Sequence, residues 1–151
     1  MKEMIYSPNS GVRLVLHTET KDGYHIGIMS YGTHPCAYVS IPKDHPYYQK
    51  YYDDIDINCH GGLTFYCPAN YIVRGGEKIC LEWAEGIEEE CSWIGWDYAH
   101  CDDYAGYYEM MPSLMFGGKK WTTQEILAEC YDVIEQLKAV ANRIQDVEIV
   151  E

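Results

Sequence analysis

The feature that most constrains the fold is a run of apolar residues near the C-terminus that recurs at every third or fourth position. Thr122 and Glu125 match the capping-box pattern that marks a helix start, and Trp121 with Ile126 occupies the positions of a hydrophobic staple. Such spacing places the apolar residues on one face of an α-helix, and that face must be buried against another element. The apolar positions are Ile126, Leu127, Cys130, Val133, Ile134, Leu137, Val140, Ala141 and Ile144.

Six segments rich in β-branched and aromatic residues supply this other element. The turn residues 21–23 predict a hairpin between the first two segments, and Gly75-Gly76 predicts a turn before the fifth. We therefore predict an α+β fold, in which an antiparallel or mixed sheet of five to six strands carries one long C-terminal amphipathic helix on one face. Residues 44–56 are too polar for a strand, which indicates a short helix or an ordered loop. The predicted strands cover residues 12–17, 24–29, 36–41, 63–67, 78–83 and 92–97.

Length and composition favour one domain. A chain of 151 residues with 47% apolar residues can bury a core without staples, so we expect a single domain over 1–151 with a frayed acidic tail at 146–151. The sequence lacks the run of about 20 apolar residues that spans a bilayer. Its start lacks a secretory segment, so we expect a cytosolic protein. The seven cysteines form no C-x-x-C pair, which favours reduced packing residues over a zinc site.

The charge balance excludes some classes of partner. With 24 acidic and 11 basic residues the net charge is −13, which repels duplex nucleic acid and anionic membranes. A small nucleotide is not excluded, because backbone amides and single basic side chains supply a positive field locally. Arg74 or the pair Lys119-Lys120 are candidate phosphate contacts. An acidic surface also suits a basic host protein.

The first candidate site is the segment His60-Gly61-Gly62-Leu63-Thr64. Two glycines permit positive φ angles and a close approach of the backbone to a ligand, and their consecutive amides can bind an anion. The alternative interpretation is a glycine turn between strands, in which the His60 side chain makes only local hydrogen bonds.

The second candidate site covers residues 93–104. Asp97, His100, Asp102 and Asp103 follow an apolar strand, and together they can bind a divalent cation or form an Asp–His pair for acid–base chemistry. Aromatic residues in the same segment offer flat faces for stacking on bases. The alternative is structural: the carboxylates cap backbone amides and the aromatic rings fill the core. The sequence contains no G-x-S-x-G, P-loop, H-E-x-x-H or Rossmann fingerprint, which argues against the common enzyme classes.

Four segments together resemble a family of uncharacterised phage and prophage proteins. The resemblance covers residues 24–145, and its defining pattern is the H-G-G-L-T block at 60–64 and the W-x-G-x-D-x-x-H block at 93–100. The other two segments are residues 32–39 and 51–55. The chain departs from the family in Cys101 and in the acidic pair Asp102-Asp103.

The resemblance implies a bacteriophage origin and an accessory gene product made in the bacterial cytosol. Small phage proteins of this kind often counter host defence, for example as a sponge that sequesters a nucleotide second messenger. We therefore predict a non-enzymatic protein without a cofactor that binds a small nucleotide ligand, and self-association as a homo-oligomer stays open. Its predicted ligand-binding residues are His60, Gly61, Gly62, Thr64, Trp93, Trp96, Asp97, Tyr98 and His100.

Two alternatives remain open from the sequence. One is a metal-dependent phosphoester hydrolase, in which a divalent metal activates water. Its ligands would be His60, Asp97, His100 and Asp102 or Asp103. The other is an inhibitor that binds a host protein through its acidic, tyrosine-rich surface, so that the two motifs serve only the fold.

Overall fold

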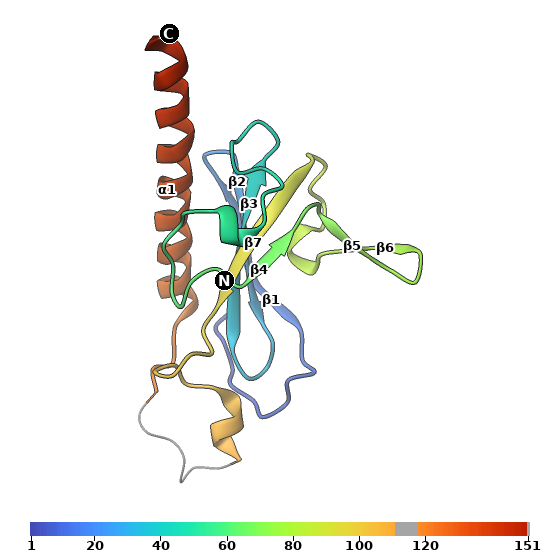
Figure 1. Cartoon of the computed structure of the whole chain (residues 1–151). Helices are drawn as coiled ribbons and strands as arrows, with labels where there is room; N and C mark the ends of the chain where they lie inside the picture. The colour runs from blue at the N-terminus through green and yellow to red at the C-terminus, as the bar shows by residue number, and fades with distance from the viewer. Residues whose placement is uncertain (111–117, 151) are drawn as a thin grey trace.

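The computed structural model describes residues 1–110 and 118–150, with the side chains of the last helix up to residue 144 (Figure 1). The described strands are β1 (Leu14–Lys21), β2 (Tyr24–Ser30), β3 (Pro35–Pro42), β4 (Phe65–Cys67), β5 (Tyr71–Arg74), β6 (Glu77–Cys80) and β7 (Cys91–Asp97). Three short 3-10 helices, η1 (Tyr52–Asp54), η2 (Glu82–Ala84) and η3 (Gly106–Glu109), lie between them, and α1 (Thr123–Val150) follows.

The main sheet has five strands in the order β1-β2-β3-β7-β4, and each neighbouring pair is antiparallel. With α1 packed across it, this arrangement confirms the predicted α+β fold (Figure 1). Nearly every residue of β2, β3 and β7 is buried. Both faces of these central strands are covered, so their sequences lack the alternation of apolar and polar residues that a half-exposed strand shows.

The apolar stripe of α1 covers one face of the sheet. Ile126, Val133 and Ile134 are fully buried and belong to the same core cluster as Ile94 and Trp96 from β7. The predicted capping box is confirmed in both directions. The Thr122 amide donates to Oε1 of Glu125 at 3.0 Å, and the Glu125 amide donates to Oγ1 of Thr122 at 3.1 Å. Residues 146–150, expected as a tail, belong to α1.

The opposite face of the sheet has a second core. There the indole of Trp83, carried by η2, stacks on Tyr38 with ring centroids 3.6 Å apart and an interplanar angle of 6°. Trp93 is fully buried in this second cluster, and its Nε1 donates to Oδ1 of Asn70 at 2.8 Å. The sheet therefore separates two hydrophobic layers, one under α1 and one under η2.

The strands differ from the prediction in two places: β1 covers Leu14–Lys21 against the predicted 12–17, and further differences lie after residue 67. The expected strand at 78–83 ends at Cys80, because the Leu81 amide bonds to the Asn70 carbonyl and the chain then turns into η2. β5 was not predicted. It pairs with β6 across Gly75-Gly76, whose φ angles of 59° and 80° suit a tight hairpin turn. This second sheet projects from the body of the molecule (Figure 1).

All seven cysteines are free thiols. None of the helices that the structure describes combines the length and the apolar content needed to cross a bilayer.

The helix face offers a direct test of the fold. Replacing the fully buried Ile134 with alanine should lower the free energy of unfolding by about 2–5 kcal/mol, because it removes core contacts and leaves a cavity. The exposed Gln124 on the same helix is the matched control, and Gln124→Ala should change stability by less than about 0.5 kcal/mol. Urea denaturation of both variants measures the difference, and equal values would contradict the assigned helix face.

Candidate functional site

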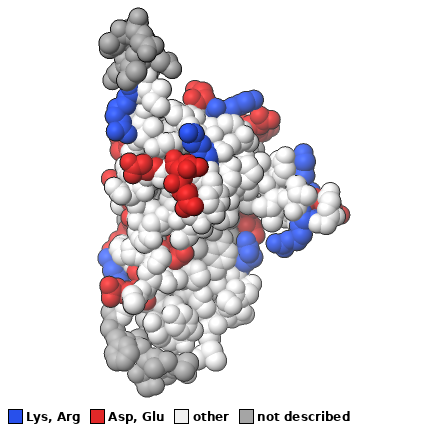
Figure 2. Space-filling model, in the orientation of Figure 1, with Lys and Arg blue, Asp and Glu red and all other residues white. Residues whose placement is uncertain are grey.

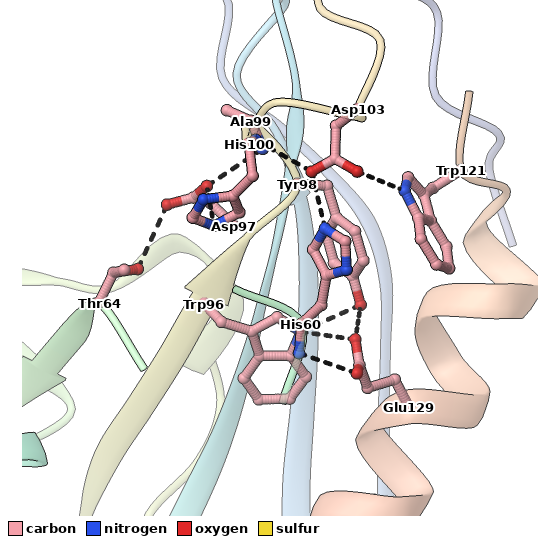
Figure 3. A network of polar contacts seen from close by, with 10 residues as sticks. All are labelled: His60, Thr64, Trp96, Asp97, Tyr98, Ala99, His100, Asp103, Trp121 and Glu129. Carbon is pink, nitrogen blue, oxygen red and sulfur yellow. Dashed lines mark hydrogen bonds and ion pairs between the residues drawn. The ribbon is translucent and has the colours of Figure 1, made fainter. Parts of the chain in front are cut away.

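The two segments singled out from the sequence meet at the end of β7, beside the first turns of α1 (Figure 3). The loop that carries His60 approaches from one side, residues 97–103 continue from β7, and Trp121 and Glu129 come from the start of α1 and the chain before it (Figure 3). Side chains distant in sequence therefore form one polar network.

The Asp103 carboxylate lies at the centre of this network. It is 3% exposed, and it accepts hydrogen bonds from Nε2 of His60 at 2.7 Å, the His100 amide at 3.0 Å and Nε1 of Trp121 at 2.8 Å. Burial raises the pKa of the Asp103 carboxyl, but these three donors outweigh burial and the net pKa is lowered. The carboxylate is thus charged and fully used within the protein. Asp102, by contrast, is exposed.

The imidazole of His60 is fixed on three sides. It stacks on Tyr98 with centroids 4.7 Å apart at 11°, and it meets the Trp121 ring edge-on at 4.9 Å. Its Nε2 faces Asp103, so in the neutral ring Nε2 carries the proton and Nδ1 bears the free lone pair. Nδ1 has no hydrogen-bond partner among the residues that the structure describes. The side chain is 24% exposed, which leaves it open to a ligand.

Glu129 of α1 holds the backbone of His60 and the Tyr98 ring on which the imidazole stacks. Its carboxylate accepts hydrogen bonds from the Tyr98 hydroxyl, from Nε1 of Trp96 at 3.2 Å and from the His60 amide at 2.9 Å. Burial raises the pKa of the Tyr98 hydroxyl, and the bond to Glu129 raises it further, so this phenol stays protonated. Glu129 therefore connects the helix, the end of β7 and the His60 loop.

A second Asp–His pair lies beside the first. Nε2 of His100 is 3.3 Å from Oδ1 of Asp97, and the other Asp97 oxygen accepts from the Thr64 hydroxyl at 3.3 Å. A Cβ atom at Gly61 would lie 2.0 Å from Nε2 of His100, and Gly61 has a φ of 68°. The glycine is therefore required, and it joins the two sequence blocks by direct contact. The two imidazole centroids are 5.6 Å apart.

The structure brings together most of the predicted ligand-binding residues, but it gives them different roles. Trp96 is 1% exposed and Tyr98 is 0% exposed. They therefore form the wall behind His60 and offer no open face for stacking. Trp93 lies on the opposite face of the sheet. The residues found together at the network are His60, Gly61, Thr64, Trp96, Asp97, Tyr98 and His100, while Gly62 is exposed next to it.

Three members of the network, Asp103, Trp121 and Glu129, were not predicted as ligand-binding residues. The sequence predicts Asp103 as part of a cation site or of an Asp–His pair, and Trp121 only as part of a hydrophobic staple. The sequence did offer a clue to Glu129, because this acidic residue stands beside Cys130 at the border of the apolar stripe. A carboxylate at such a border faces the core edge and needs donors there.

The basic residues predicted as phosphate contacts lie in two different places. Lys119 lies over the Trp121 ring, with Nζ 3.9 Å from its centroid, and also bonds to Glu125 at 2.6 Å. Lys120 lies over Tyr104 at 4.5 Å. Both lysines thus stand near the network, whereas Arg74 is on the projecting hairpin. Within residues 1–110 and 118–144, no cluster of three or more His, Cys, Asp and Glu side chains is arranged to hold a metal ion.

Alanine substitutions at Asp103 and at its neighbour Asp102 form a matched pair of variants. Asp103→Ala should lower the free energy of unfolding by about 3–5 kcal/mol, because it leaves two ring N–H groups and one amide without their buried acceptor. Asp102→Ala removes an exposed carboxylate of the same kind and should change stability by less than about 0.5 kcal/mol. Thermal and urea unfolding of the two variants measure the difference, and similar losses would remove Asp103 from its central role.

Comparison with known proteins gives no relative from which a role for this site can be transferred. The chain matches no protein-family model, no curated protein and no solved structure. The function must therefore be inferred from the arrangement of its own residues.

Proposed function

We propose that the protein is a phage accessory protein that sequesters a small anionic ligand, a nucleotide second messenger of host defence, at the surface formed by His60 and His100. The observation that carries the proposal is the pair of imidazoles 5.6 Å apart, each held by its own carboxylate. Side-chain exposures of 24% and 39% leave both rings accessible.

The surroundings of the two imidazoles suit a phosphate group. Gly61 and Gly62 are exposed and have positive φ angles, so their backbone can approach a ligand closely. Imidazole N–H groups bind phosphate oxygens by charge-assisted hydrogen bonds when protonated. Lys119 lies over the ring of the partly exposed Trp121 and Lys120 lies over Tyr104, so both add positive charge near the imidazoles. These features act locally against the net charge of −13.

Sequestration is favoured over chemistry because the buried carboxylates and the neighbouring thiol are not available to react. The Asp103 and Glu129 carboxylates accept hydrogen bonds from the protein itself. Burial raises the pKa of the neighbouring Cys59 thiol to about 12, so it is not a nucleophile at neutral pH. A site built in this way holds its side chains in place for binding.

Equilibrium binding tests the proposal. Against cyclic dinucleotides, cyclic trinucleotides and ADP-ribose isomers, we expect at least one ligand to bind with a micromolar or tighter Kd. His100→Ala should weaken that binding by about tenfold or more, because it removes one phosphate donor worth roughly 1.4 kcal/mol. Calorimetry and thermal unfolding should show that the melting temperature moves by only a few degrees.

The matched control is another histidine away from the site. His25 on β2 bonds to the Thr20 hydroxyl at 2.8 Å, and His25→Gln should leave the Kd of the same ligand unchanged. The proposal fails if no ligand of the panel binds more tightly than millimolar, or if His25→Gln and His100→Ala weaken binding equally.

A second candidate function, phosphoester hydrolysis, is favoured by one observation. The free Nδ1 of His60 is backed by Asp103 through Nε2, which is the arrangement that orients a histidine as a general base. The predicted metal ligands are His60, Asp97, His100 and Asp102, but no group of three or more His, Cys, Asp and Glu side chains among the described residues is arranged to hold a metal ion.

Hydrolysis converts the ligand, whereas sequestration leaves it intact. Under hydrolysis, a phosphodiester incubated with excess protein at neutral pH is converted, and His60→Gln slows the conversion by about 100-fold or more. Elemental analysis of protein purified without chelator then reports whether Zn, Mn, Fe or Ni accompanies it in stoichiometric amount. Recovery of the intact ligand from heat-denatured protein argues for sequestration.

A further inference from the structure

A cavity that shares no residue with the His60 site lies beside the β5–β6 hairpin. Its volume of about 500 Å³ falls within the range of pockets that bind small molecules. Its walls come from four segments of the chain: the loop before η1, the β4–β5 connection, the hairpin itself and the loop that leads into β7 (Figure 1). The residues that define its chemistry are Tyr48, Tyr71, Lys78, Ile87, Glu88 and Glu90.

Only one face of the hairpin lines the cavity. Cross-strand pairing puts Tyr71, Lys78 and Cys80 on the same face, and all three line the cavity. Ile72 and Arg74 lie on the other face, where Ile72 packs on the second core. Basic side chains are visible on the projecting hairpin in Figure 2. Of the two that β5 and β6 carry, Lys78 is the one that lines the cavity.

The walls of the cavity are held in place by hydrogen bonds. The Asn70 side chain donates to a carbonyl of the loop before β7 at 2.8 Å and accepts from Nε1 of Trp93 at 2.8 Å. Gln49 has a φ of 57°, a conformation that is unfavourable for a residue with a side chain. Its amide donates to Oγ of Ser92 at 3.0 Å and its side chain donates to the Pro68 carbonyl at 3.1 Å. Walls that are already ordered lose little entropy when a ligand binds.

Two opposite charges line the cavity without being paired. Within the part of the chain that the structure describes, neither Lys78 nor Glu88 forms a salt bridge. Glu90 also lines the cavity, but it is bonded to Lys43 at 3.1 Å. Nζ of Lys78 lies 4.6 Å from the centroid of the Tyr71 ring, and this contact positions the ammonium group. The cavity therefore offers one cation and one anion to a bound molecule.

We infer that this cavity binds a small zwitterion with an apolar body, which is the chemistry of a free amino acid or a dipeptide. The carboxylate of the ligand pairs with Lys78 and its ammonium group pairs with Glu88, because each contact is a charge-assisted hydrogen bond. The rings of Tyr48 and Tyr71 and the side chain of Ile87 provide the wall for its apolar part. A zwitterion has no net charge, so the acidic surface of the chain does not repel it. A simple acid or amine leaves one of the two charges without a partner.

Matched ligands test the inference. Calorimetry of the full chain at about pH 6, where an α-amino group is protonated, should give a submillimolar Kd for L-phenylalanine or for the dipeptide alanyl-phenylalanine. The better of the two shows which size of zwitterion fits. Its N-acetylated form lacks the ammonium group and its amide form lacks the carboxylate, so each should bind about tenfold more weakly or worse.

An exposed thiol provides a second readout of the occupied cavity. Cys80 lines the cavity, whereas Cys101 is exposed elsewhere. The bound zwitterion should slow the alkylation of Cys80 by iodoacetamide and leave the alkylation of Cys101 unchanged. Mass spectrometry of the digested protein measures both rates in one sample, and equal protection of the two thiols contradicts binding in this cavity.

Neutral variants at exposed positions assign each contact. Lys78→Met should weaken binding of the zwitterion and of its N-acetylated form but leave the Kd of the amide form unchanged. Glu88→Gln should weaken binding of the zwitterion and of the amide form but leave the Kd of the N-acetylated form unchanged. Arg74→Met and Glu77→Gln alter the opposite face of the same hairpin and are the matched controls, with no change in Kd expected.

Three outcomes overturn the inference. They are the absence of any zwitterion Kd below the millimolar range, equal binding of the zwitterion and its blocked forms, and equal losses in the cavity variants and their controls. His100→Ala should bind the zwitterion as the wild-type chain does, because the cavity and the imidazole pair share no residue. A failure at one site is therefore distinguishable from a failure at the other.

Discussion

Burial of the apolar face of α1 on the sheet is the interaction on which the rest of the structure depends. Ile126, Val133 and Ile134 fill the space over Ile94 and Trp96, and this contact fixes the rotation of the helix about its axis. With the rotation fixed, Glu129 at the border of the stripe must face the end of β7. The hydrophobic core thus decides where the carboxylate of the polar network lies.

The network at the end of β7 follows from that position, because buried polar groups need partners. Asp103 and Glu129 are each satisfied by several donors, and these bonds hold His60 against Tyr98. Breaking these buried hydrogen bonds costs free energy, so the imidazole is held in one orientation. The groups left open, Nδ1 of His60 and the His100 edge, are the ones a ligand can meet. Because these side chains are already ordered, less conformational entropy is lost when a ligand binds.

Periodicity predicted the parts of the fold that bury apolar surface. The helix, its capping box and the strands β1, β2, β3 and β7 follow from local pattern, whereas the exposed β5 has no such pattern to report. The site was predicted in part. Trp93 and Trp96 are three residues apart on one strand, so they must point to opposite faces, and only Trp96 belongs to the network. The bond between the His60 amide and Glu129 spans 69 positions, which no local pattern encodes.

The excess of acidic residues constrains how this chain can meet other molecules. A net charge of −13 repels anions and other copies of the chain alike, so attraction must come from places where nitrogen groups gather. Within the described residues, the imidazole pair with Lys119 and Lys120 nearby is such a place. It lies at the end of β7 (Figure 3). A local group of nitrogen atoms can therefore attract a small anion while the rest of the surface stays acidic.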